Sequence, residues 1–331
     1  MKILSAQQTR EADAYTISHE PISSIDLMER ASNAFLSWFM DHYENNLQVS
    51  IVAGTGNNGG DGLAIARLLH HQGYQIKCFV IRGGVPESVD FARNLERLRE
   101  VLPIVEISED TQIQQIDDPD VIIDGIFGSG ISRPVEGLYL GIVNYIKNSV
   151  SEVVSIDMPS GLYCDDHTPG LAINATHTVS FQRPKLAFMV PQNGRYVGDW
   201  HVVDIGLDEG FIEEMDTDLH LIDEQQIRSF IQPRKKYSHK GTYGRALLVG
   251  GSSGKMGAAV LAAKACMRSG PGLLTVQVPG CGYGILQNSI PEAMVLIDEG
   301  EKFIESVFDV ERFSTLGIGP GLDKQQTTVK M

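Results

Sequence analysis

Short apolar runs alternate with amphipathic segments along most of the chain. Apolar residues at helical spacing predict two helices, over 5–16 and 26–42, before the first strand. The expected strands are 49–53, 75–82, 103–107, 120–126, 152–157, 176–181 and 200–205, and the expected helices between them are 61–72, 88–101 and 136–149. This alternation predicts an α/β fold, a Rossmann-like, doubly wound and mostly parallel sheet that helices cover on both faces.

The pattern changes after residue 208, where the sequence becomes acidic and irregular and then basic over 233–241. A second series of α/β elements follows. They are a strand at 246–249, a glycine loop at 250–257, a helix at 258–267, a strand at 273–278 and a strand with a glycine turn at 316–322. The chain of 331 residues exceeds the usual size of one domain, so we expect two, at 1–215 and 225–331.

Composition narrows the class of protein. A formal net charge of −15 disfavours nucleic acids and membrane surfaces as partners, because both are polyanionic. The four cysteines are scattered with no C-x-x-C pair, which indicates neither a disulfide framework nor a zinc site. The first ten residues lack the apolar core of a signal peptide, and no run of 18 apolar residues occurs. We therefore expect a cytoplasmic protein.

The loop Gly54–Gly62 carries most of the chemical information. It follows a β-branched run, precedes a helical pattern and satisfies G-x-G-x-x-G, so its backbone N–H groups can face a ligand at a helix N-terminus. However, it also contains Asn57, Asn58 and Asp61, and a carboxylate there would repel a pyrophosphate. These side chains suit a cation, a sugar hydroxyl or proton transfer. The alternative is a plain turn with Asp61 as a helix N-cap.

Two more loops follow predicted parallel strands and should reach the same edge of the sheet, where ligands bind in such folds. Asp124 and Asp157 end two of these strands, and burial of an aspartate is costly without a partner. The oxygens of Asn58, Asp124 and Ser160 are hard ligands that suit a monovalent cation. The run from Gly128 to Pro134, with Ser129, Ser132 and Arg133, is a candidate phosphate cradle, or else a flexible surface loop.

Two other residues leave alternatives open. Lys185 can reach the same edge, although a solvated lysine is the more common case. Arg82 stands where a dehydrogenase needs an acid for the ribose hydroxyl, so an oxidoreductase would have to use NADP. The loop at Gly254-Lys255-Met256 lacks the Walker A pattern.

Taken together, these motifs resemble the NAD(P)H-hydrate repair family, whose bifunctional members fuse an NAD(P)HX epimerase to a ribokinase-like dehydratase. The first domain matches through Leu27–Ala31, the loop Gly56–Gly62, Asp124–Gly130 and Asp157–Gly161. The second matches through His239–Gly244, Gly250–Ser252, Gly257–Ala259 and Gly317–Leu322. The resemblance implies a Rossmann-like domain followed by part of a ribokinase-like α/β domain.

The resemblance also implies site residues. The hydrated dinucleotide would contact Asn57, Asn58, Gly59, Gly60, Asp61, Gly128, Ser129, Gly130, Ile131, Ser132, Arg133, Pro134 and Asp157, and in the second domain Ala258 and Gly321. A potassium ion would bind Asn58, Asp124 and Ser160. ADP or ATP would serve the dehydratase domain if that domain is complete. Asp157 is the expected catalytic acid/base, with Lys185 second.

We therefore expect residues 1–210 to epimerise R- and S-NADHX and NADPHX, the hydrated forms of NADH and NADPH, in a homo-oligomer. The alternative is a nucleotide- or protein-binding module without turnover. The dehydratase motif Gly-x-Gly-Asp appears nowhere after residue 225. We accordingly expect that the 331-residue chain alone does not dehydrate S-NADPHX, whether it is part of a longer protein or a truncated one.

Overall fold

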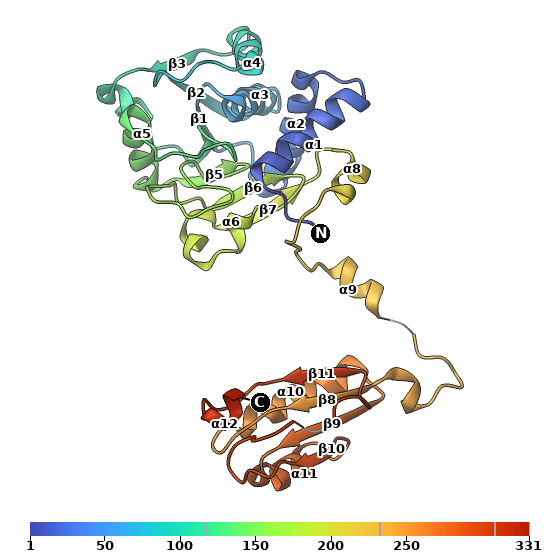
Figure 1. Cartoon of the computed structure of the whole chain (residues 1–331). Coiled ribbons are helices and arrows are strands. Elements are labelled where there is room, and N and C mark those ends of the chain that lie inside the picture. The colour runs from blue at the N-terminus through green and yellow to red at the C-terminus, as the bar shows by residue number, and fades with distance from the viewer. Residues whose placement is uncertain (117, 232, 308, 331) are drawn as a thin grey trace. The chain divides into compact units, whose positions relative to one another are not determined.

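The computed structural model describes residues 1–116, 118–231, 233–307 and 309–330. The chain divides into two compact units, which we call unit 1 (Met1–Phe230) and unit 2 (Ile231–Met331). Each unit has its own sheet and helices (Figure 1). The helix α9 (Glu224–Phe230), at the end of the acidic stretch, belongs to unit 1.

Unit 1 is built on a seven-stranded sheet in the order β3-β2-β1-β4-β5-β6-β7, and every described pair of neighbours is parallel. The strands are β1 (Gln48–Ala53), β2 (Gln75–Ile81), β3 (Ile104–Ile107), β4 (Val121–Gly125), β5 (Glu152–Ile156), β6 (His177–Phe181) and β7 (Asp199–Val203). The α/β doubly wound prediction is therefore confirmed, and the predicted strand positions agree within two residues.

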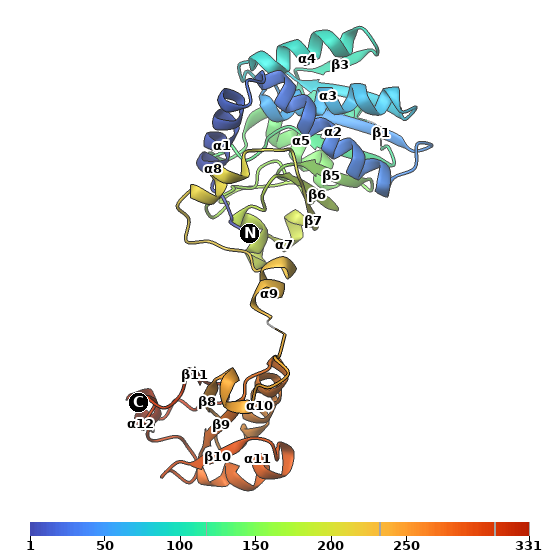
Figure 2. The same cartoon turned by 90° about the vertical axis from the view of Figure 1, so that its right-hand side faces the viewer.

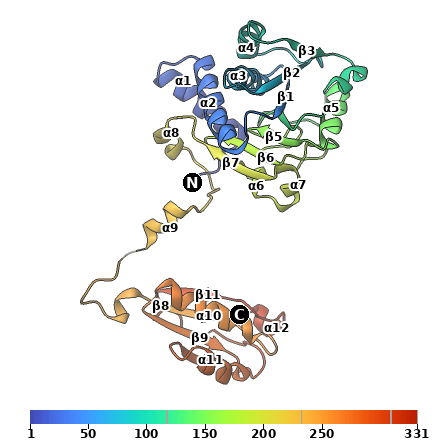
Figure 3. The same cartoon turned by 180° about the vertical axis from the view of Figure 1, so that it is seen from behind.

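Helices cover both faces of this sheet. They are α1 (Ala6–His19), α2 (Ser24–His42), α3 (Asn57–His71), α4 (Val89–Arg99), α5 (Gly137–Lys147), α6 (Leu186–Met189), α7 (Gly194–Val197) and α8 (Glu209–Glu214). Figures 1 and 3 show α2, α3 and α4 on the opposite side of the sheet from α5. Because strand side chains alternate, Ile51 joins the core under α2 and α3, whereas Val52 joins the core under α5.

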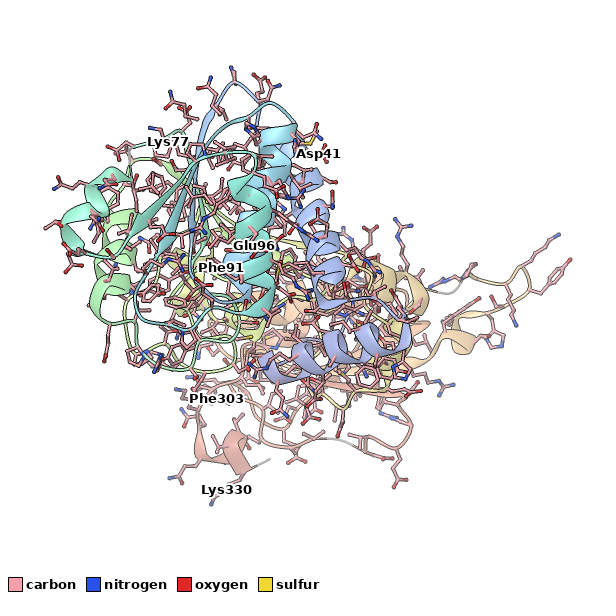
Figure 4. All side chains as sticks on the ribbon, turned by 90° about the horizontal axis from the view of Figure 1, so that it is seen from above. Asp41, Lys77, Phe91, Glu96, Phe303 and Lys330 are labelled. Atoms are coloured by element: carbon pink, nitrogen blue, oxygen red, sulfur yellow. The ribbon has the colours of Figure 1, made fainter. Side chains whose placement is uncertain are left out.

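The helices follow the sequence pattern because their apolar stripes are buried. In α2, Leu27, Ala31, Phe35 and Phe39 lie three to four residues apart and are buried, and the Ser23 hydroxyl caps the N-terminus. In α4, Phe91 is fully buried (Figure 4). Such stripes fix the helices against the sheet and hold the strand ends that form the site.

The strand order reverses at β1, whose neighbours are β2 on one side and β4 on the other. In open parallel sheets this reversal separates the loops at the carboxyl ends and opens a crevice for a ligand. The loop after β1 and the loop after β4 border that point in unit 1.

Unit 2 carries a four-stranded parallel sheet in the order β10-β9-β8-β11. Its elements are β8 (Arg245–Val249), α10 (Met256–Ser269), β9 (Leu273–Val278), α11 (Tyr283–Ser289), β10 (Met294–Ile297), β11 (Thr315–Ile318) and α12 (Gln326–Lys330). Figure 2 shows this unit from the side. Sequence reasoning missed α11, which is short and mixes polar with apolar residues, and β10, an apolar run of only four residues. No helix in the described part of the chain is long and apolar enough to cross a membrane.

Candidate functional site

A cleft of about 460 Å³ lies at the carboxyl edge of the unit 1 sheet. Residues from α1, α3 and α5, from the loops after β1, β2 and β4, and from the chain at or just after the ends of β5, β6 and β7 line it. They are Thr9, Arg10, Asp13, Thr55, Gly56, Asn57, Asn58, Asp61, Val85, Ile126, Phe127, Gly128, Ser129, Gly130, Ile131, Ser132, Arg133, Tyr139, Asp157, Phe181, Ile205 and Leu207. Thus most of the predicted contacts in unit 1 come together here, and Gly59 and Gly60 belong to the same turn.

The glycine turn leads directly into a helix N-terminus. Helix α3 begins at Asn57 with Gly56 as its N-cap, four residues before the predicted start. The first bond of the helix runs from Gly60 N to Gly56 O, so the amides before Gly60 have no acceptor within the helix and can bind a ligand. The interpretation of Asp61 as an N-cap is wrong, because Asp61 lies inside the helix.

Close backbone packing explains why glycine recurs in this turn. A Cβ on Gly59 would lie 1.9 Å from Gly54 O, whereas a Cβ on Gly56 would meet nothing within 4 Å. We expect Gly59→Ala to lower the free energy of unfolding by about 3 kcal/mol through overpacking. Gly56→Ala, the matched control, should change it by less than about 0.5 kcal/mol. Urea unfolding measures both, and equal effects would contradict this packing argument.

An oxygen-rich cluster lies behind the cleft, at the end of β4. The fully buried Asp124 carboxylate accepts hydrogen bonds from Ser155 Oγ (2.8 Å), Ser160 N (2.8 Å) and Ser160 Oγ (2.5 Å). Ser160 Oγ also lies 3.2 Å from Phe127 O. Because one hydroxyl proton serves only one acceptor at a time, Ser160 Oγ can donate to Asp124 or to Phe127 O but not to both.

Asn58 lies beside this cluster. Its Oδ1 faces Gly128, at 3.0 Å from the position a Cβ would take there, and its buried Nδ2 has no hydrogen-bond partner among the described residues. Burial raises the pKa of Asp124, although hydrogen bonds from Ser160 and Ser155 act in the opposite direction. Oxygen ligands from an amide, a carboxylate and a hydroxyl fit a hard monovalent cation chemically.

Asp157, the predicted catalytic acid/base, forms an ion pair with Lys185. Asp157 follows β5 with φ +62°, a left-handed conformation that is uncommon outside glycine and concentrates at functional sites. Lys185 Nζ lies 3.0 Å from Asp157 Oδ1 and also donates to Phe181 O (3.2 Å) and Arg183 O (3.1 Å). The Lys185 side chain is 0% exposed, so the alternative of a solvated lysine is wrong.

The hydrogen bonds leave one oxygen of Asp157 available. Ser180 Oγ and Phe181 N, both at 3.3 Å, approach the same Oδ1 that Lys185 binds. Oδ2 has no partner among the residues that the structure describes, and Asp157 lines the cleft. The geometry thus presents a carboxylate that is held by one oxygen and free to act through the other.

Sequence reasoning missed the contribution of α1. Asp13 from this helix lines the cleft with Asp61 and Asp157. Burial and the negative charge of Asp157 raise the pKa of Asp13 to about 6, against a smaller opposite effect of Lys185. Burial, then Asp157 and Asp13, raise the pKa of Asp61 well above its ordinary value. Only the polar positions Thr9 and Asp13, four residues apart, hinted that one face of this helix meets a site.

Two arginines border the cleft. Arg10 from α1 lies near Gly130, with its guanidinium 3.8 Å from the position of a Cβ there, and Arg133 comes from the predicted phosphate cradle. Both are exposed, and within the described ranges neither makes a hydrogen bond or ion pair. Arg82 differs, because Glu87 and Glu106 hold its guanidinium. Arg82 is thus engaged where an NADP-dependent oxidoreductase would need it free.

In unit 2, the two predicted contact residues lie together at the carboxyl edge. A Cβ on Gly321 would approach Ala258 Cβ to 3.2 Å. The loops after β8 and β11 are joined there, because Ser252 Oγ donates to Gly321 O at 2.7 Å and Gly251 N donates to Pro320 O at 2.9 Å. These strands are neighbours where the strand order of this sheet reverses.

A parallel sheet with a glycine turn, a helix N-terminus and acidic side chains at its point of reversal defines unit 1 as a Rossmann-like domain with a small-molecule cleft. Residues 24–187 match the family described as YjeF-related protein N-terminus, and residues 246–331 match NAD(P)H-hydrate dehydratase. The fold is similar to that of a yeast protein in a crystal structure, with a TM-score of 0.56, 22% identity, and 68% of this chain and 98% of that chain covered.

The chain is also similar in sequence to two curated relatives. The bifunctional NAD(P)H-hydrate repair enzyme Nnr of Moorella thermoacetica is 33% identical over 353 residues, which cover 100% of this chain and 66% of the relative. The NAD(P)H-hydrate epimerase of Limosilactobacillus fermentum is 37% identical over 202 residues, 61% of this chain and 95% of the relative. The chain belongs to the NAD(P)H-hydrate repair family, and it spans less than two thirds of the length of the bifunctional relative.

Proposed function

We propose that unit 1 epimerises the R and S forms of NADHX and NADPHX at ring carbon 6. The observation that carries this proposal is the Asp157 carboxylate, fixed through Oδ1 by the buried Lys185 and open to the cleft through Oδ2. A proton acceptor held in this way beside a helix N-terminus suits a reaction that moves a proton on a phosphorylated ligand.

Different residues of the cleft would bind the phosphates, pack against the ring and transfer the proton. The amides of the first turn of α3, with Arg10 and Arg133, would bind the phosphates of the dinucleotide. Tyr139, Phe127 and Ile131 add apolar surface against which a ring can pack, and they exclude water from the reacting carbon. Asp157 would take a proton from, or return it to, the oxygen on carbon 6.

The direct test mixes the purified chain with isolated R-NADPHX and separates the isomers by chromatography over time. We expect the approach to the R/S equilibrium to be much faster than the spontaneous exchange. Tight binding of NADPHX without acceleration would instead favour the alternative, a binding module without turnover. An oxidoreductase would be tested in separate samples that contain NADPH and an oxidised acceptor, where hydride transfer removes the absorbance of the dihydronicotinamide ring.

We also propose potassium as the cation held by Asn58, Asp124 and Ser160, where it would neutralise the buried carboxylate. Exchange of KCl for tetramethylammonium chloride at equal ionic strength should lower the Tm of unit 1, because a cation at 10–100 times its Kd stabilises the fold by about 1.5–3 kcal/mol. In Asn58→Ala this difference should shrink. An identical Tm in both salts for the unchanged protein would contradict the assignment.

For unit 2 we propose a relation to the ADP- or ATP-dependent dehydration of S-NAD(P)HX, with Ala258 and Gly321 in contact with the hydrated nicotinamide nucleotide. The match of residues 246–331 to the dehydratase family supports this relation.

We also propose that the protein is cytoplasmic and forms a homo-oligomer. The four free cysteines and the net charge of −15 favour a reducing compartment and disfavour nucleic-acid partners. Light scattering tests the oligomeric state.

A further inference from the structure

We propose that Asp13 is a second catalytic acid/base group of the epimerisation, which works with Asp157 in the same cleft. This inference rests on the proposed function. Asp13 comes from α1, a helix to which the sequence motifs assign no role, whereas Asp157 follows β5. The two carboxylates therefore reach the reacting carbon from different elements.

Asp13 has no polar partner that would give it a structural role in the described part of the chain. Neither Asp13 nor Asp61 makes a hydrogen bond or ion pair with any residue in the described ranges, although Asp157 and Asp124 make several. A carboxylate that is largely buried without a partner destabilises a fold. Such a group is retained where a ligand or a reaction uses it.

Helix α1 is held in place on both sides of Asp13. At its N-terminus Ser5 and Gln8 form a capping box, and Ala6 N donates to Asp165 Oδ2 at 2.9 Å. Toward its C-terminus Tyr15 stacks on Phe211 of α8 with ring centroids 4.0 Å apart (Figure 2 shows the two helices side by side). The Asp13 carboxylate is thus positioned by the fold, as a catalytic group must be.

The two carboxyl groups differ in their charged surroundings. Lys185 Nζ forms an ion pair with Asp157 Oδ1 at 3.0 Å, whereas burial and then the negative charge of Asp157 raise the pKa of Asp13 to about 6, against a smaller opposite effect of Lys185. Arg10 and Arg133, the cations at the border of the cleft, have no direct contact with Asp13. An ionised and a protonated carboxyl group in one site are the pair that combined acid and base catalysis requires.

In the proposed reaction, Asp13 gives its proton to the hydroxyl on carbon 6. The C6–O bond then breaks, and its electron pair stays on the oxygen of the water that leaves. The lone pair of ring nitrogen N1 forms the N1=C6 double bond of an iminium ion. Water adds to the other face of carbon 6, the N1=C6 pair returns to nitrogen, and Asp157 Oδ2 accepts the proton of the incoming water. A proton transfer from Asp157 to Asp13 restores the starting state, and the reverse sequence converts the other epimer.

The test compares wild type, Asp13→Asn and Asp157→Asn with Glu11→Gln, which changes an exposed carboxylate on the same helix. We expect Asp13→Asn to lower kcat about 10²–10⁴-fold, the usual contribution of one acid/base group. Glu11→Gln should keep the wild-type rate. The wild-type kcat/KM should fall as the pH rises above about 6, where Asp13 loses its proton, and this limb should vanish in Asp13→Asn.

The affinity for NADP⁺ distinguishes a catalytic role of Asp13 from a structural role. The Kd of NADP⁺, measured by calorimetry, should change less than threefold in Asp13→Asn, since the amide keeps the shape of the side chain. A variant that retains more than a tenth of the wild-type kcat, keeps the pH limb or loses NADP⁺ binding overturns the role of Asp13 and leaves the proposed function standing. A wild-type protein that does not accelerate epimerisation overturns both.

Discussion

Replacing Lys185 with methionine is expected to lower the free energy of unfolding of unit 1 by about 3–5 kcal/mol, the usual effect of removing one partner from a buried ion pair. Lys185 Nζ is 3.0 Å from Asp157 Oδ1 and fully buried, and it also satisfies two backbone carbonyls. Methionine fills the space but leaves a buried carboxylate and two acceptors without donors.

The other unit offers a matched control. Lys255 Nζ lies 3.1 Å from Asp323 Oδ2, almost the same distance, but the lysine side chain is 53% exposed. Lys255→Met should therefore cost no more than about 1 kcal/mol, as exposed pairs do. Calorimetry measures both variants. The two tryptophans, Trp38 and Trp200, lie in unit 1, so their fluorescence identifies the transition of that unit.

A double variant tests whether the unpaired charge of Asp157 causes the loss of stability. Asp157→Asn in the Lys185→Met background removes the unpaired carboxylate and should restore part of the lost stability, so that the two effects are not additive. Additive losses, or a Lys185→Met effect no larger than that of Lys255→Met, would show that packing rather than ion pairing fixes this part of the site.

The sheet of unit 1 was predictable because its signals are local. Apolar runs such as 121–123 and 153–156 indicate buried strands, and the alternation with helices implies parallel pairing, so the meeting of Asn58, Asp124 and Asp157 loops at one edge follows from topology. The helix start was wrong for an equally local reason. Asn and Gly have low helix propensity, so the pattern pointed to 61, whereas the backbone continues the helix from Asn57.

Lys185 and Asp13 show where sequence reasoning fails. The sequence of the segment Phe181–Lys185 is typical of a polar turn. In the structure the chain turns at the left-handed Gln182 (φ +57°), and the lysine returns to Asp157. Asp13 lies in a helix outside the motifs, and its place in the cleft depends on tertiary packing against α8. The spacing of Thr9 and Asp13 puts both on one face of the helix, but it does not indicate which part of the fold that face meets.

Asp13→Asn is expected to stabilise unit 1 at pH 7.5 while it removes activity. Burial and Asp157 raise the pKa of Asp13 from 3.8 to about 6 in the folded protein. The folded state therefore binds the proton more tightly than the unfolded chain does, and stability falls as the pH rises from about 4 to about 6. The difference corresponds to an upper value of about 3 kcal/mol, at about 1.4 kcal/mol for each pKa unit.

Asparagine cannot ionise, so this loss is absent from the variant. At pH 4 the two proteins should have nearly equal stability, and above pH 6 Asp13→Asn should exceed wild type by about 1–3 kcal/mol. Urea unfolding from pH 4 to 8, followed by tryptophan fluorescence, measures the difference, with Glu11→Gln as the control that follows wild type. A variant that is less stable than wild type at pH 7.5 would mean that the carboxylate has a structural partner. A more stable but inactive variant would show that the fold tolerates an unfavourable charge because the reaction needs it.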